Sequence, residues 1–147
     1  MHVPMYAPVG HGSDDEKPVM QKQLLKLFND NHVDMVIQGH EHLYMRTYPM
    51  NASGKPVKDA ETVTEDGVTY VKDPGAPIFF MTGKTGMDGE GPYGSYDPSP
   101  FVKYGDAEET SYGLFRIEGN KLTVEAHYVQ NGRLKTYDTF GIIHDDK

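Results

Sequence analysis

The most restrictive pattern in this sequence lies in its C-terminal part, where runs of alternating apolar and polar residues are separated by two-residue turn signals. In the stretch Leu122-Thr123-Val124-Glu125-Ala126-His127-Tyr128 the alternation is typical of a sheet with one solvated face. Turns that contain Asn and Gly favour tight connections between antiparallel neighbours. We therefore predict an antiparallel meander with strands near 112–118, 121–130 and 133–143, joined at Gly119-Asn120 and Asn131-Gly132.

The N-terminal half has the pattern of a helix followed by buried strands. Apolar residues between Val19 and Phe28 fit one helical stripe, and Asn29-Asp30-Asn31 ends it, so we predict one main helix near 17–31. Short apolar runs favour buried strands, and they lie at 33–37, 43–48 and 78–81. The fold class we expect is α+β, a partial α/β sandwich that is mostly β.

Two segments interrupt these regular elements. Residues 51–77 are polar, and Asp66-Gly67 between two β-type runs is a strong hairpin signal, so we predict an exposed hairpin excursion there. Residues 83–110 are rich in Gly, Pro, Tyr and Asp and predict a long loop. A length of 147 residues fits one domain, so we interpret residues 1–147 as a single unit.

Charge and composition exclude several classes of partner and site. The formal net charge is −8, which repels the phosphates of nucleic acids and of anionic lipids alike. No stretch approaches the roughly 18 apolar residues of a membrane span. The sequence contains no Cys, so any metal ion must be held by His, Asp, Glu, Asn or Tyr. We expect neither a nucleic-acid partner nor a membrane span.

His40 and His42 are the sharpest candidates for metal ligands. They directly follow a buried-type strand, and on an extended segment two such residues point to the same side, roughly 6.6 Å apart along the strand. That separation suits one His on each ion of a dinuclear centre, whose ions lie about 3.5–4 Å apart. We expect Gly39 to let the backbone turn tightly beside them. The alternative is a surface turn that happens to contain two His.

His2 is the third candidate, because His2-Val3-Pro4-Met5-Tyr6 has the composition of a strand end. A parallel α/β sheet would bring such a strand end and the 40–42 loop to the same edge, where sheets of this kind build their sites. Taken alone, His2 fits a flexible terminus equally well.

The ordered set of motifs resembles the C-terminal half of the calcineurin-like metallophosphoesterases, and most of all their purple acid phosphatase branch. The residues that carry the resemblance are His2-Val3-Pro4-Met5-Tyr6, the helix, Gly39-His40-Glu41-His42-Leu43-Tyr44-Met45-Arg46, Ile78 to Gly83 and the terminal meander. The resemblance implies a four-layer fold of which this chain supplies the C-terminal half. It also implies hydrolysis of phosphomonoesters by a water activated by two divalent or trivalent metal ions, Fe, Zn or Mn.

The resemblance implies a role for individual residues. His2 and His40 match ligands to one ion, and His42 matches a ligand to the other. His11 matches a catalytic His that contacts the substrate phosphate or protonates the leaving group. Arg46 continues the alternation from His40 and His42, so it is a candidate for phosphate binding, with a structural salt bridge as an equal alternative.

The family also needs Asp and Asn ligands, which do not occur at matching positions here, so we interpret the chain as a partial domain whose N-terminal half is missing. We expect that half and a phosphate-ester substrate as partners, weak metal occupancy, and little or no phosphatase activity from this chain alone. A homodimer formed through exposed sheet edges is a further hypothesis. The resemblance favours a secreted or cell-surface location. The alternative function is a β-rich accessory or binding module with at most a structural His-metal site.

Overall fold

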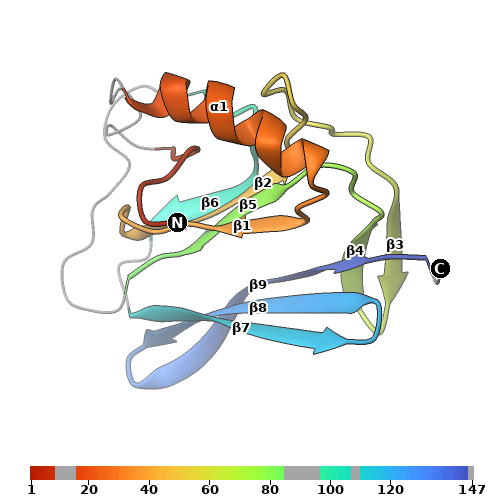
Figure 1. Cartoon of the computed structure of the whole chain (residues 1–147). Helices are drawn as coiled ribbons and strands as arrows, with labels where there is room; N and C mark the ends of the chain where they lie inside the picture. Colours follow the sequence, from red (N-terminus) through yellow and green to blue (C-terminus); the bar gives the residue numbers. More distant parts are fainter. Residues whose placement is uncertain (9–15, 85–96, 107–109, 146–147) are drawn as a thin grey trace.

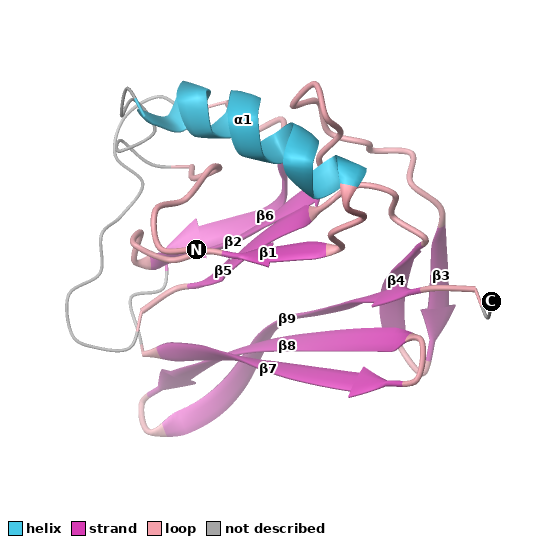
Figure 2. Ribbon diagram, in the orientation of Figure 1, coloured by secondary structure: helices cyan, strands magenta, loops and turns pink. Residues whose placement is uncertain are grey.

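The computed structural model of the chain describes residues 1–8, 16–84, 97–106 and 110–145 (Figure 1). The helix α1 lies over one face of a first sheet, and a second sheet lies against the other face, which gives three layers (Figure 2). The elements in chain order are α1 (Glu16–Asp30), β1 (Met35–Ile37), β2 (Leu43–Pro49), β3 (Thr62–Glu65), β4 (Val68–Lys72), β5 (Ile78–Thr82), β6 (Phe101–Asp106), β7 (Ser111–Glu118), β8 (Lys121–Gln130) and β9 (Arg133–Ile143).

The first sheet is mixed and has the strand order β1-β5-β2-β6. Strands β1 and β5 run parallel, with Val36 opposite Phe79. Strand β2 pairs antiparallel with β5 on one side and with β6 on the other. The end of β1 and the start of β2 are therefore separated only by the width of β5, and the connection between them carries His40 and His42.

The second sheet has the order β3-β4-β9-β8-β7 and contains the predicted meander. Strands β7, β8 and β9 pair antiparallel in sequence, which confirms that prediction. At the turn between β8 and β9, Asn131 and Gly132 both have a positive φ, 52° and 69°. Those angles are the ones that a tight hairpin turn of this kind requires and that Asn and Gly adopt most readily.

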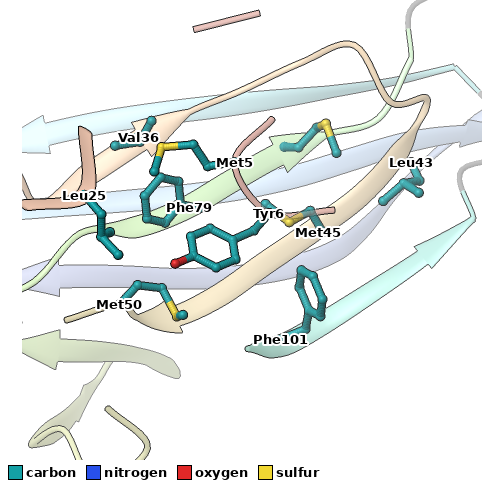
Figure 3. Close-up of a cluster of buried hydrophobic side chains, with 10 residues drawn as sticks. Met5, Tyr6, Leu25, Val36, Leu43, Met45, Met50, Phe79 and Phe101 are labelled. Atoms are coloured by element: carbon teal, nitrogen blue, oxygen red, sulfur yellow. The ribbon is translucent and has the colours of Figure 1, made fainter. Parts of the chain in front are cut away.

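Two apolar cores hold the layers together because consecutive residues of the central strands point to opposite faces. Phe79 and Met81 of β5 pack with Met45 under α1, while Ile78 and Phe80 face the second sheet. Figure 3 shows the core under the helix, where Tyr6 and Met5 from the N-terminal segment lie among side chains from α1 and the first sheet. The N-terminal segment is thus part of the core and is fixed against the first sheet.

The structure differs from the sequence-based expectations in two segments. The hairpin over 62–72 forms as predicted, but it is not a free excursion, because β4 pairs in parallel with β9 and so extends the second sheet. The predicted loop over 83–110 contains β6, which forms the edge of the first sheet by pairing with β2. The rest of that loop lies partly outside the described residues. In the described part of the chain, no helix is long and apolar enough to cross a membrane.

The residues that follow β9 are tied to both sheets. Nδ1 of His144 lies 2.9 Å from a carboxylate oxygen of Asp73, and its Nε2 lies 3.0 Å from a carboxylate oxygen of Asp34. The two carboxylates come from the end of β4 and from the entry to β1, so His144 links the two sheets. These partners raise the pKa of His144 above its ordinary value, and the contact with His144 lowers the pKa of Asp73.

Candidate metal centre

Two of the predicted metal ligands, His2 and His40, meet at one point although they are far apart in the sequence. Nε2 of His2 lies 3.2 Å from Nδ1 of His40. Their rings are 5.1 Å apart and close to perpendicular, with an interplanar angle of 80°. Both residues are exposed.

Backbone hydrogen bonds bring the two segments together. The amide of Gly39 donates to the carbonyl of His2 at 3.1 Å, and the terminal amine of Met1 donates to the carbonyl of Ile37 at 2.7 Å. The first residues therefore run beside the end of β1 and the turn that follows it. This neighbourhood was predicted, but no strand forms in residues 1–8, so backbone bonds to the turn take the place of the expected strand end.

The backbone at the turn differs from the extended segment that we predicted. Residues 40–42 form a bend, and His40 itself has a φ of 72°. The side-chain spacing expected for two residues of a strand therefore does not apply to His40 and His42. Gly39 does not supply the unusual angle, since its own φ is not positive. A Cβ at Gly39 would also lie 3.7 Å from Nδ1 of His2, an ordinary contact distance. The tight turn is made by His40.

His42 lies at the end of this bend, directly before β2, and its side chain is exposed. Glu41, between the two His, has the opposite environment and is 1% exposed. In the described residues no group of three or more His, Cys, Asp or Glu side chains is arranged to hold a metal ion. His2 and His40 thus form an incomplete set.

Tyr6, the end of the first motif, belongs to the core rather than to this site. Its ring packs on Phe79 with 4.8 Å between ring centres, and its hydroxyl is buried with no hydrogen-bond partner among the described residues. Burial raises the pKa of Tyr6 to about 12, so the phenol stays neutral. Tyr6 anchors the segment that carries His2.

Arg46 lies between the two sheets, away from solvent. Its Nε donates to the Asp138 carboxylate at 2.9 Å, its guanidinium lies 4.2 Å from the centre of the Phe140 ring, and its side chain is 13% exposed. The Tyr44 hydroxyl donates to the same carboxylate at 2.5 Å. The structure shows the salt bridge that was one of the two roles left open for Arg46, and its role in phosphate binding stays a prediction.

The roles predicted for the individual histidines stay predictions. His11, the predicted catalytic and phosphate-contacting residue, lies outside the described residues. Its role stays a prediction, as do the metal-ligand roles of His2, His40 and His42. Sequence reasoning missed Gln38, whose buried side chain contacts the N-terminal segment, and Asp138, which partners Arg46. A polar residue at the end of an apolar strand was the only available signal for Gln38, and Asp138 had none beyond its alternating position.

Comparison with known proteins supports the fold. No protein-family model matches the chain, and no curated protein matches it significantly. The chain is similar to the solved structure of a purple acid phosphatase from yellow lupin (Lupinus luteus) seeds, with a TM-score of 0.64 and 20% sequence identity. The match covers 95% of this chain and 23% of that protein's chain. At this identity the similarity establishes a shared fold, so this chain has the fold of about a quarter of that protein's chain.

Proposed function

We propose that the chain is the histidine-bearing C-terminal part of a metal-dependent phosphoesterase that hydrolyses phosphomonoesters. His2 and His40 would hold one metal ion, and His42 would contribute to a second. The fold similarity to a purple acid phosphatase supports the class of protein. The observation that carries the proposal is the convergence of His2 and His40 from two separate segments.

The distance between the two ring nitrogens suits a shared ion. Two imidazole nitrogens that each bind one ion at about 2.0–2.1 Å are about 2.9 Å apart in octahedral geometry and about 3.4 Å apart in tetrahedral geometry. The observed separation is 3.2 Å, between these values. A hydrogen bond between the two rings gives the same distance. Titration of the chain with metal separates a shared ion site from a hydrogen-bonded pair.

The chemistry of the proposal is that of metal-assisted hydrolysis, in which bound ions polarise the phosphoryl oxygens and supply a nucleophilic water near neutral pH. The chain's own contribution is positional. His2 is held through its backbone and through Tyr6 in the core, and His40 is held in a tight bend. Exposed rings on a fixed backbone allow an ion and a substrate to approach from solvent.

The proposal also predicts that the chain alone is a poor catalyst. The described residues supply no carboxylate beside the two imidazoles to complete an ion's coordination. We therefore expect the Asp and Asn ligands to come from a further stretch of polypeptide, and we expect weak metal binding and negligible turnover from residues 1–147.

Isothermal titration of the metal-free chain with Zn²⁺ or Mn²⁺ tests the proposal. We expect weak saturable binding that is lost in His2→Ala and in His40→Ala. The matched control is His32→Asn, since His32 is an exposed His with a positive φ of 52° that lies outside the cluster, and Asn tolerates that angle. The control should bind as the unchanged chain does.

Two results would contradict the proposal. One is metal binding that survives both His2→Ala and His40→Ala, which would favour an accessory module with a metal site elsewhere. The other is strong hydrolysis of 4-nitrophenyl phosphate by the isolated chain with Mn²⁺, Zn²⁺ or Fe added. If that activity were abolished by His40→Ala, the ligand set in this chain would be complete, contrary to our interpretation.

A further inference from the structure

We propose that Gln38 is a positioning residue for the metal centre and that its side chain fixes the segment of His2 relative to the bend of His40. This inference rests on the proposed function for its biological meaning. Its structural content, the placement of one imidazole beside the other, can be tested without metal. Gln38 does not touch the imidazole nitrogens in question and acts through the backbone of the neighbouring segment.

The Gln38 carboxamide bonds to two successive residues of the N-terminal segment. Its Oε1 accepts from the amide of Met5 at 3.0 Å, and its Nε2 donates to the carbonyl of Tyr6 at 2.6 Å. By donating one hydrogen bond and accepting another, the Gln38 carboxamide satisfies backbone groups of residues 5 and 6 in the way that a neighbouring strand would. The side chain is buried, with 5% exposure, so water does not readily substitute for these bonds.

The backbone of Gln38 fixes the other side of the centre. Its amide donates to the carbonyl of Phe80 at 2.9 Å, which anchors it to β5 in the middle of the first sheet. The next residue, Gly39, donates to the carbonyl of His2, and His40 follows directly. Gln38 is therefore rigidly attached to the sheet on its main-chain side and to the N-terminal segment on its side-chain side.

The contacts lie on both sides of His2 in the sequence. Residues 1 and 2 bond to the backbone of 37 and 39, and residues 5 and 6 bond to the side chain of Gln38. A second glutamine, Gln21 of α1, donates to the carbonyl of Met5 at 2.7 Å and ties the same segment to the helix. Without the Gln38 side-chain bonds, the segment keeps its attachment to α1 and its backbone bonds at residues 1 and 2, and it loses its side-chain attachment to the residue that leads into the bend of His40.

The test compares Gln38→Met with Thr47→Val. Methionine has nearly the length of glutamine and forms neither bond, so the change removes the hydrogen bonds with little change in volume. Thr47 is equally buried in the first sheet, and its hydroxyl accepts from the amide of Phe79 at 2.9 Å, so Thr47→Val removes a buried bond that does not involve residues 1–8. The two variants therefore separate a general loss of stability from a loss of positioning.

Two readouts are made on the full chain. The first is the nuclear Overhauser effect between ring protons of His2 and His40 in the metal-free protein, which is observable because the ring centres are 5.1 Å apart. The second is the affinity for Zn²⁺. We expect Gln38→Met to lose the ring contact and to weaken Zn²⁺ binding at least 10-fold, within the range of about 10–100-fold found for residues that orient metal ligands. Thr47→Val should retain the ring contact and bind Zn²⁺ within about twofold of the unchanged chain.

The outcomes distinguish this inference from the proposed function. A Gln38→Met protein with an intact ring contact and unchanged Zn²⁺ affinity would overturn the positioning role, whatever the metal data for the histidine variants show. Equal losses of the ring contact and of Zn²⁺ affinity in Thr47→Val would also overturn the positioning role, because they would show that a general loss of stability causes the effect. Loss of the ring contact in Gln38→Met alone, in a chain that binds no Zn²⁺ at all, would support the positioning role and contradict the proposed function.

Discussion

Replacing Asp138 with alanine should destabilise the chain strongly, because this carboxylate is the partner of an arginine held between the two sheets. The side chains of Asp138 and Arg46 are 10% and 13% exposed. The Tyr44 hydroxyl also donates to Asp138. Burial is the main cause that raises the pKa of Tyr44 well above its ordinary value, and the Asp138 carboxylate raises it further, so the phenol remains a donor at any physiological pH. Alanine would leave both donors without their acceptor in a largely buried space.

The magnitude follows from the burial. Removing one partner of a buried ion pair costs about 3–5 kcal/mol, because the remaining charge is uncompensated. The site is not completely sealed, since the Arg46 and Asp138 side chains keep 13% and 10% exposure, so we expect the lower end, about 3 kcal/mol. In a chain of this size that corresponds to a fall in melting temperature of about 10 °C.

Urea denaturation followed by circular dichroism measures this change, with the double replacement Arg46→Met and Asp138→Leu as the control. The double variant removes the charges together, so it should be clearly more stable than Asp138→Ala, although Tyr44 still lacks its acceptor. A loss below about 1 kcal/mol in Asp138→Ala would show that water reaches the pair, since that is the range of exposed ion pairs. A double variant as unstable as the single one would refute the assignment of the cost to an unpaired charge.

Two further predictions give separate checks. The pKa of His144 is raised above its ordinary value of 6.5, so the stability that its protonated ring contributes is fully present below pH 6.5 and is lost as pH rises through the folded-state pKa. The pKa of Asp73 is lowered from 3.8, so its contribution is present above pH 3.8 and is lost as pH falls through its folded-state value. At pH 5.5 the melting temperature of the unchanged chain should therefore be higher than that of His144→Ala, by less than about 4 °C because the groups are partly exposed. The difference should shrink by pH 9. A constant difference across this range would contradict the ion-pair explanation. Gly141→Ala should lower the free energy of unfolding by about 1–3 kcal/mol in urea titrations, because overpacking is costly and the new Cβ would meet a backbone oxygen at 2.6 Å. Gly39→Ala is the control, since its Cβ has only ordinary contacts, and its free energy of unfolding should stay within about 0.5 kcal/mol of the unchanged chain. Equal effects of the two substitutions would contradict this packing explanation.

The elements that the sequence predicts correctly are those whose cause is local. Helix α1 has its apolar stripe within a few turns, and the β8–β9 hairpin has Asn131-Gly132 at its turn, where the positive φ values require such residues. Strand β6 was missed because its pairing with β2 joins residues as far apart as Leu43 and Asp106. Its Gly- and Pro-rich surroundings indicate a loop, and tertiary pairing overrides that preference.

The candidate site was only partly predictable for a related reason. Spacing and motif predicted that His2 and His40 lie close together, but the extended geometry predicted for residues 40–42 was wrong. His40 adopts a positive φ, and this angle is not signalled by a glycine at that position. Gln38 was missed because its importance comes from contacts with residues 32 and 33 positions away in the sequence. Roles that depend on which distant backbone a side chain meets have no signature in local periodicity.

The most direct test of the central claim is a Zn²⁺ titration of the chain with ¹⁵N-labelled imidazoles, followed by nuclear magnetic resonance. The structure identifies the atoms, Nε2 of His2 and Nδ1 of His40, which lie 3.2 Å apart. If one ion binds both, the resonances of these two nitrogens should change together, with a single apparent affinity, while those of His32 stay constant. Changes at only one of the two nitrogens, or at each with a different affinity, would contradict a shared metal centre.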